Sequence, residues 1–318
     1  MNRTIKLLRI LLLWYSLFPI AFTEGVMKTQ AQETFLFHHL TRNEGLLHDN
    51  VTCFAQDSLG FIWMGTHRGL NRYDGYRLEG YKYERDPINS VYYNRVHSLQ
   101  HIGKHLWIAT EAGIACFDIY QKQFVDFSID CPTETSFFSQ VKVLQKGNGN
   151  ELWLLSENQI YRAKIISDPK TKKLLLKCLP IGEHLSLSTT QLNHQIAVSP
   201  NGTVWLSGNP TLTTYRYTQG KDELISSPTP IASGIVKMRY AEGFLWVIYT
   251  DRLVKYRYLP NNSYQIVAQK VFDNHKALLS LTVGTHYVWV VNEESVFQLR
   301  KEDLSLLKEH THSPSNPY

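Results

Sequence analysis

The sequence predicts an all-β fold, a β-propeller of four-stranded blades, from its tryptophan spacing, its local strand pattern and its composition. Six tryptophans recur at intervals of 41 to 52 residues, and each follows an apolar stretch and a polar turn. The chain also contains 18 Tyr and 14 Phe, residue types that favour strands. A period of roughly 40 to 50 residues that holds about four short strands is typical of propeller blades. The six residues are Trp63, Trp107, Trp153, Trp205, Trp246 and Trp289.

The first blade shows this pattern most completely. Its inner strand is predicted at residues 51–55, and Gly60 stands in the following hairpin, where the backbone needs a positive φ. Because blades pack face to face, we interpret the six tryptophans as structural wedges between neighbouring blades. The propeller domain is expected over residues 32–310, with blades at approximately 50–83, 94–129, 138–179, 190–227, 233–272 and 277–310.

Residues 35–40 form an additional predicted strand before blade one. Such a leading strand usually supplies the outer edge of the last blade and closes the ring. Blade six, however, has its own predicted outer strand near residues 304–308. We therefore expect either an incomplete seven-bladed ring in a truncated or shortened chain, or a ring of six blades with residues 35–40 beside blade six. Residues 311–318 carry no strand pattern and are expected to be a disordered tail.

The first 31 residues predict a secretory signal peptide. Arg3, Lys6 and Arg9 precede an apolar run over residues 10–22, and Ala31 ends a small-x-small cleavage site. The alternative is a retained membrane anchor, but the 13 residues of the run are short for a bilayer span of about 20. No later stretch is apolar enough to cross a membrane. The mature chain is therefore expected to be exported, with no membrane span.

Charge and cysteine content argue against several classes of partner. The formal net charge is +5, and about three units of it belong to the first 31 residues. The mature part has no basic stripe, so a nucleic-acid partner is not expected. The four cysteines lack a C-x-x-C pair, which predicts neither a zinc site nor a disulfide scaffold. No metal or cofactor is expected; the cysteines are Cys53, Cys116, Cys131 and Cys178.

Catalytic motifs are missing from the sequence. It contains no G-x-S-x-G elbow, no phosphate-binding loop and no H-E-x-x-H pair. Because His97, His101 and His105 fall on a strand, a turn and the next strand, we do not expect them to converge on a metal. A glycosidase would need two free carboxylates, but Asp57 precedes a turn glycine and is predicted to cap that hairpin. We predict no catalytic residue and keep a propeller glycosidase as the weakest alternative.

The N-terminal part of the propeller resembles the two-component regulator propeller family. The resemblance rests on Gln56-Asp57-Ser58-Leu59-Gly60-Phe61-Ile62-Trp63-Met64-Gly65-Thr66 and Gly69-Leu70-Asn71-Arg72-Tyr73-Asp74-Gly75, together with shorter matches at residues 37–41, 44–46 and 50–52. It implies the periplasmic sensor part of a hybrid two-component system, which typically detects oligosaccharides. It also implies a kinase core and output domains, which this sequence does not contain. The resemblance therefore predicts a periplasmic ligand-sensing module that cannot itself phosphorylate.

In a propeller, the loops that enter the inner strands and the turns between second and third strands gather at one end of the ring. In blades one and two these connections carry aromatic, arginine and amide side chains, which suit an oligosaccharide ligand. The alternative is a protein-interaction or dimerisation module that binds a second copy or a related sensor protein. The expected ligand-binding residues are His67, Arg68, Tyr92, Tyr93, Asn94, Arg95 and Glu111.

Overall fold

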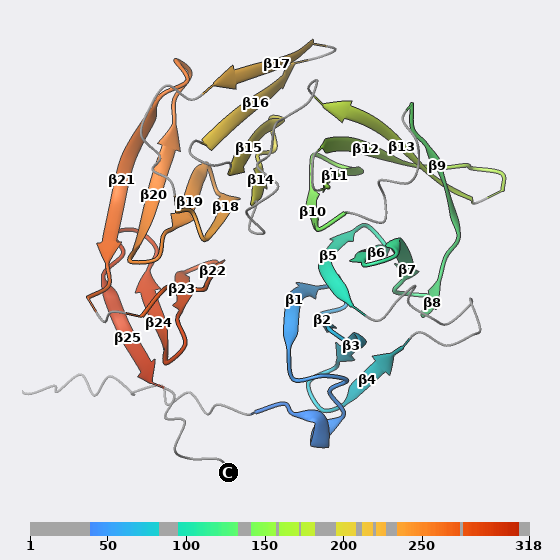
Figure 1. The fold of residues 1–318 in the computed structure, drawn as a ribbon, viewed down its shortest axis with the longest axis horizontal. Coiled ribbons are helices and arrows are strands. Elements are labelled where there is room, and N and C mark those ends of the chain that lie inside the picture. Colours follow the sequence, from blue (N-terminus) through green and yellow to red (C-terminus); the bar gives the residue numbers. More distant parts are fainter. Residues whose placement is uncertain are drawn as a thin grey trace, which may run out of the picture. The chain divides into compact units, whose positions relative to one another are not determined.

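The computed structural model contains six antiparallel meander sheets arranged as the blades of a ring (Figure 1). The prediction of an all-β propeller is confirmed. One 3-10 turn, η1 (Arg42–Glu44), precedes the first strand, and the described residues contain no α-helix. The structure describes residues 39–82, 95–132, 141–156, 159–171, 173–181, 195–207, 212–218, 221–226, 234–273 and 276–311. The predicted signal peptide, nearly all of the leading strand and residues 312–318 lie outside this part.

In each blade the strands are ordered from the inner one to the outer one, as in β1-β2-β3-β4. Blade one comprises β1 (Val51–Gln56), β2 (Ile62–Thr66), β3 (Gly69–Tyr73) and β4 (Leu78–Tyr81). Blade two comprises β5 (Val96–Ile102), β6 (His105–Thr110), β7 (Gly113–Asp118) and β8 (Gln123–Phe124). Blade three comprises β10 (Val143–Lys146), β11 (Glu151–Leu155), β12 (Ile160–Ser167) and β13 (Leu174–Ile181).

The remaining blades keep the same order. Blade four comprises β14 (Ile196–Val198), β15 (Thr203–Ser207), β16 (Leu212–Thr218) and β17 (Lys221–Ser226). Blade five comprises β18 (Lys237–Ala241), β19 (Phe244–Ile248), β20 (Arg252–Tyr258) and β21 (Tyr264–Val271). Blade six comprises β22 (Ser280–Val283), β23 (Tyr287–Val291), β24 (Ser295–Arg300) and β25 (Leu306–Thr311).

Blade three differs from the others because it has a fifth strand, β9 (Phe127–Asp130). The sequence pattern placed residues 127–129 in blade two. In the structure β9 leaves blade two and runs parallel to β13, at the outer edge of blade three (Figure 1). Without β9, the outer edge of β13 would be unpaired. By covering this edge, β9 satisfies its backbone groups.

The hydrophobic core lies between blades. Trp63 of β2 is fully buried and packs edge-on against Phe117 of blade two, with 5.0 Å between ring centroids. Trp107 reaches the cluster of blade three in the same way, and it meets Phe127 at 5.1 Å. Trp153, Trp205 and Trp246 continue the series toward blades four, five and six. Each buried indole therefore packs one blade against the next.

The contact between blade six and blade one departs from this series. The inner strands contact one another from β1 through β5, β10, β14 and β18 to β22, and no contact of that extent joins β22 to β1 among the described residues. Phe54 of β1 is 64% exposed, whereas Leu99, at the matching position of blade two, is 6% exposed. Trp289 of blade six is only partly buried. Blades one and six thus expose faces that the other blades bury.

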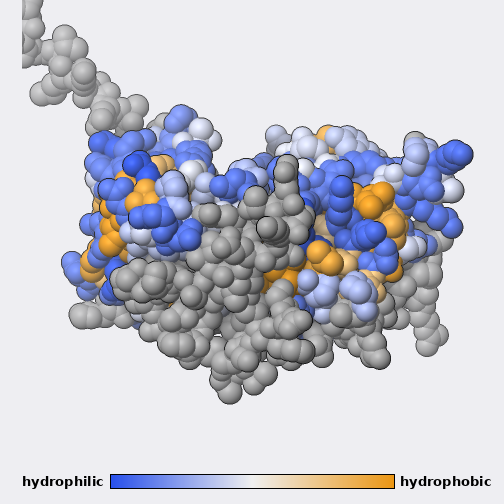
Figure 2. Space-filling model, turned by 90° about the horizontal axis from the view of Figure 1, so that it is seen from above, coloured by the Kyte–Doolittle hydropathy of each residue, from blue (hydrophilic) through white to orange (hydrophobic). Residues whose placement is uncertain are grey.

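Further apolar side chains are exposed on the outer strands. Ile266, Val267 and Val271 of β21 belong to this group. Figure 2 shows such apolar surface as separate patches among hydrophilic side chains. Isolated exposed apolar residues are normal on folded proteins, so these positions do not by themselves mark a binding site.

The hairpin between β1 and β2 is held by one carboxylate. Asp57 Oδ1 accepts hydrogen bonds from the backbone N–H groups of Leu59 and Phe61, at 2.9 and 3.0 Å. Its Oδ2 accepts the indole N–H of Trp63 at 2.7 Å. Gly60 has a φ of 89°, which a residue with a side chain rarely adopts. The predicted capping role of Asp57 is confirmed, and the side chain also orients the first tryptophan of the ladder.

We predict that Asp57→Ala destabilises the propeller by about 1–3 kcal/mol, because it leaves the buried indole N–H of Trp63 without an acceptor. The free energy of unfolding, measured by urea denaturation, checks this. Asp303→Ala is the matched control, since Asp303 caps an exposed turn through Ser305 and holds no indole. The control is expected to change stability by about 0.5 kcal/mol or less. Equal losses in both variants would show that the indole contact is not decisive.

Candidate ligand-binding face

Hydroxyl side chains shape the turns that leave the second strand of the first blades. Thr66 Oγ1 donates to the carbonyl of Gly69 at 2.9 Å and accepts the backbone N–H of Arg68 at 3.1 Å. Thr110 Oγ1 makes the equivalent bonds to Gly113 and Ala112, at 3.0 and 3.2 Å. The two turns are therefore built alike, and both present their tips at the same end of the ring.

The residues after these threonines meet the loops that enter the inner strands. The N–H of His67 donates to the carbonyl of Asn50 at 3.3 Å, and that of Glu111 donates to the carbonyl of Arg95 at 3.2 Å. These matching bonds place His67 in blade one and Glu111 in blade two at equivalent positions. Three side chains predicted from the sequence, those of His67, Arg95 and Glu111, are thereby gathered at one site.

Two contacts define the geometry of this site. The Arg95 Nη1 atom lies 3.4 Å from the Glu111 Oε1 atom, in an exposed ion pair. The rings of His48 and His67 lie 5.5 Å apart between centroids, at a tilt of 31°. His48 is held in place by its Nδ1 atom, which accepts the backbone N–H of Asn50 at 2.9 Å. The site therefore combines imidazole, guanidinium and carboxylate groups from two blades.

The surroundings of the site lower the pKa of two imidazoles, those of His67 and His97. Partial desolvation lowers the pKa of His67, the charge of Arg95 and the neighbouring His48 lower it further, and Glu111 opposes them. Desolvation lowers the pKa of His97, on β5, to about 4, with Lys142 and Arg95 as further causes. Both shifts favour the uncharged form of the ring at neutral pH. A neutral imidazole has one donor and one acceptor nitrogen, which suits hydroxyl groups.

The ring of His97 has a further property. Its Nε2 atom is buried and has no hydrogen-bond partner in the described part of the chain. His97 is two residues from Arg95 along the chain, and the charges of Arg95 and Glu111 both influence its pKa. A buried polar atom without a partner calls for an explanation such as an unseen water or ligand. His97 therefore extends the site inward along β5.

The structure describes four of the seven predicted site residues, namely His67, Arg68, Arg95 and Glu111. Arg68 is exposed in the same turn as His67, whereas Tyr92, Tyr93 and Asn94 lie outside the described residues. His48 and His97 were not predicted as site residues. The only sequence signal for His48 was its position in the loop before β1, and His97 gave none, because its inclusion depends on how blade two packs against blade one.

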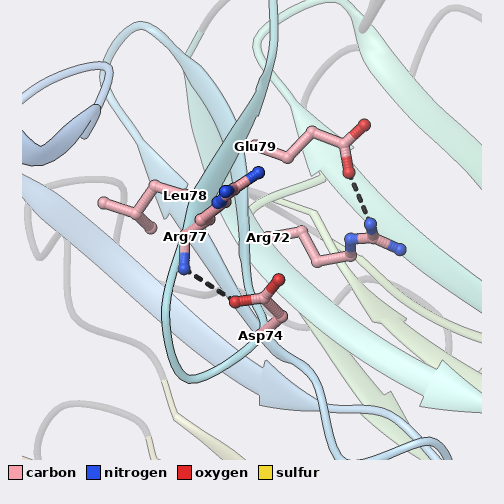
Figure 3. A pocket seen from close by; sticks show the side chains of 5 residues that line it. All are labelled: Arg72, Asp74, Arg77, Leu78 and Glu79. Atoms are coloured by element: carbon pink, nitrogen blue, oxygen red, sulfur yellow. Dashed lines mark hydrogen bonds and ion pairs between the residues drawn. The ribbon is translucent and has the colours of Figure 1, made fainter.

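A concave region lies elsewhere, on the outer hairpin of blade one (Figure 3). It is a shallow pocket of about 250 Å³ whose two carboxylates, Asp74 and Glu79, already have hydrogen-bond or ion-pair partners. Arg72 Nη2 lies 2.5 Å from Glu79 Oε2, and Asp74 Oδ1 accepts the backbone N–H groups of Tyr76 and Arg77 at 2.8 and 2.7 Å. The pocket is thus a by-product of turn formation and offers little to a ligand.

Three aspartates of blades one and two that could supply a carboxylate for glycoside hydrolysis have structural contacts instead. Asp118 Oδ1 accepts two backbone N–H groups at 3.0 Å, and its Oδ2 lies 2.7 Å from the Lys104 ammonium. Asp57 and Asp74 cap turns in the same manner. These bonds occupy the oxygens that a general acid or nucleophile would need. Within the described ranges, no group of three His, Cys, Asp or Glu residues is placed to share a metal ion, and no helix could cross a membrane.

Comparison with known proteins supports the resemblance seen in the sequence. Residues 45–68 match the family described as two component regulator propeller. A 77-residue segment, 24% of this chain, is 30% identical to histidine kinase P4 of Formosa agariphila. The segment spans only 6% of that kinase.

Solved structures of low sequence identity share the fold. The extracellular domains of two putative hybrid two component systems of B. thetaiotaomicron superpose with TM-scores of 0.56 and 0.57, at 20% and 16% identity. The alignments cover 84% and 89% of this chain but 34% and 38% of those domains. Inactive virginiamycin B lyase from Staphylococcus aureus has a TM-score of 0.59 at 14% identity, over 84% of this chain and 85% of the lyase.

The chain thus spans about a third of the two component sensor domains that it resembles. The family match covers β1, the Asp57 hairpin, β2 and the turn that carries His67. This segment holds both the first tryptophan of the ladder and part of the candidate site. The chain is therefore a β-propeller whose first blade matches the family described as two component regulator propeller.

Proposed function

We propose that this propeller is a periplasmic ligand-sensing module of a two-component regulator, and that it binds an oligosaccharide over blades one and two. The observation that carries the proposal is the meeting of His67, Arg95 and Glu111 at one end of the ring. The family match over residues 45–68 supports the sensor role. Kinase and output functions would be supplied by other domains.

The chemistry of the face suits a neutral, hydroxyl-rich ligand. Guanidinium and carboxylate groups bind sugar hydroxyls as donor and acceptor, and neutral imidazoles do both. The ion pair of Arg95 and Glu111 is exposed, so a ligand can reach both partners without breaking a buried contact. The buried Nε2 of His97 adds a polar atom deeper in the site.

The same geometry favours binding without catalysis. The carboxylates of Asp57, Asp74 and Asp118 accept backbone N–H groups in turns, so none is free to act as an acid or nucleophile. Glu111 is paired with Arg95. The likeness to virginiamycin B lyase, at 14% identity, concerns the fold alone.

We predict that Arg95→Ala lowers affinity for a bound oligosaccharide by about tenfold or more, because a charged hydrogen bond contributes about 1.5–3 kcal/mol. A glycan array identifies the ligand, and titration calorimetry with that glycan measures the affinity of wild type, Arg95→Ala and His67→Ala.

Arg77→Ala is the matched control for this experiment. Arg77 is an exposed arginine on the outer hairpin of blade one, away from the turn that carries His67. The affinity of the Arg77→Ala variant for the glycan is expected to stay at the wild-type value. Unchanged affinity in both site variants would move the binding site to another face, and an array without any bound glycan would reject the oligosaccharide as ligand.

A second candidate function is self-association, and the exposed faces of blades one and six favour it. At every other junction in the ring, the tryptophan of one blade packs against the inner strand of the next blade. The inner-strand residue that corresponds to Phe54 is buried at each of these junctions. Blade six of one copy and blade one of another offer the two halves of such a junction. Under this alternative the propeller is an interaction module whose partner is a second copy of the chain.

We predict for this alternative that Phe54→Ser shifts the protein toward monomer at concentrations where wild type associates. Sedimentation velocity over a concentration series measures the distribution. Val267→Ser is the control, since Val267 is an exposed apolar residue on the outer strand of blade five. A wild-type chain that stays monomeric throughout the series would eliminate the alternative.

A further inference from the structure

Two of the four cysteines become neighbours at the outer edge of blade three. Strand β9 pairs in parallel with β13, in a register that joins Ile129 to Leu176 and Asp130 to Lys177. Strand β9 ends at Asp130, and continuing the same register by one residue brings Cys131 opposite Cys178. Neighbouring strands lie about 4.8 Å apart, which falls within the roughly 4.4–6.8 Å that disulfides need between Cα atoms.

Both thiols lie on the same face of the sheet. Phe127, Ile129 and Cys131 alternate along the chain and pack against one hydrophobic cluster. Leu176 and Cys178 alternate in the same way on β13 and belong to that cluster. The electrostatic influence of Cys131 on Cys178 agrees with this proximity. Both cysteines are free thiols in the structure, and the register and the shared face place them next to each other.

We propose that Cys131 and Cys178 form a disulfide bond when the chain folds in an oxidising environment, joining β9 covalently to β13. The oxidant is a disulfide-bearing compound, such as a thiol oxidase or oxidised glutathione. The Cys131 thiolate attacks a sulfur of the oxidant and releases one thiolate from it. The Cys178 thiolate then attacks the Cys131 sulfur and releases the second one. The two protons and two electrons lost by the cysteines are thereby transferred to the oxidant, which is reduced to two thiols.

The two cysteines have different access to an oxidant. Cys131 is partly exposed, whereas Cys178 is 3% exposed. Burial, followed by the effects of Cys131 and Asp130, raises the pKa of Cys178 to about 12. Because only the thiolate is nucleophilic, Cys178 reacts slowly once its face is covered. The bond therefore forms during folding and is protected afterwards.

The bond would reinforce a weakly held part of the ring. β9 comes from the connection that follows blade two and covers the edge of blade three with four residue pairs. Besides the packing of Phe127 and Ile129, the described residues provide one ion pair at this edge, between Lys177 and Asp130 at 3.9 Å. Such an exposed ion pair adds little stability. A covalent link at this edge ties the exit of blade two to blade three.

The other two cysteines have no such partner. Cys53 lies opposite Gly65 in blade one, and Cys116 lies opposite Trp107 in blade two. Burial raises the pKa of the Cys53 thiol to about 11. These two positions therefore supply the internal control, because they should remain thiols under the conditions that link Cys131 to Cys178.

In the test, the full chain is refolded with oxidised and reduced glutathione. Free thiols are then alkylated in denaturant with iodoacetamide, and the peptides are mapped without reduction. We expect alkylation at Cys53 and Cys116, and one pair of peptides linked through Cys131 and Cys178. Alkylation of all four cysteines, or a link between other positions, would overturn the proposal. Adding the oxidant only after folding is expected to give slower formation of the same link.

A stability measurement separates a structural bond from an incidental one. Reduction is expected to lower the urea midpoint of wild type and of Cys53→Ser, and to leave that of Cys131→Ser unchanged. A midpoint that does not respond to reduction in wild type would contradict a stabilising bond. If Cys131→Ser does not fold, peptide mapping and the wild-type midpoints with and without reductant decide the question.

Discussion

The fold depends on one repeated contact, the packing of a tryptophan from the second strand of one blade against the next blade. A four-stranded meander is too thin to bury its own faces, so its stability must come from its neighbours. Trp63, Trp107 and Trp246 are fully buried in clusters that contain residues of two blades. Each indole removes a large apolar area from water, and the blades cannot separate without exposing it.

The indole N–H groups of Trp63, Trp205 and Trp246 have three different hydrogen-bond acceptors. Trp63 donates to Asp57 within its own blade, whereas Trp205 donates at 3.0 Å to Tyr264 of the following blade. Trp246 donates to the carbonyl of Ala241 at 3.4 Å. The apolar contact therefore repeats and its hydrogen bond does not. This difference explains why the Gln56–Thr66 motif fades along the chain while the tryptophan spacing persists.

The propeller could be predicted from the sequence because the ladder is a local pattern with a fixed period. Strand β9 could not, because the alternation of Phe127, Ser128 and Ile129 shows that a strand exists but not which edge it joins. The predicted spacing also assigned the cysteines no common role. Only the parallel register of β9 and β13 places Cys131 beside Cys178.

Likewise, the sequence could indicate some residues of the candidate site and not others. His67 and Glu111 could be predicted together because Thr66 and Thr110 make the same turn in successive blades. His97 could not, because it lies within the register shift between Val96 and Ser98. A similar shift occurs in β1, between Val51 and Cys53. Such bulges turn side chains out of the regular alternation, and single-sequence patterns do not reveal them.

The site and the tryptophan ladder are joined through the inner strands. Strand β2 carries Trp63 and ends at Thr66, next to the turn of His67. Thr52 Oγ1 lies 3.0 Å from the carbonyl of Gly65 in blade one and 2.7 Å from that of Val96 in blade two. The candidate face therefore spans the junction that Trp63 closes. A ligand held by residues of both blades would resist their separation, so binding there favours the packed state of this junction over any looser one.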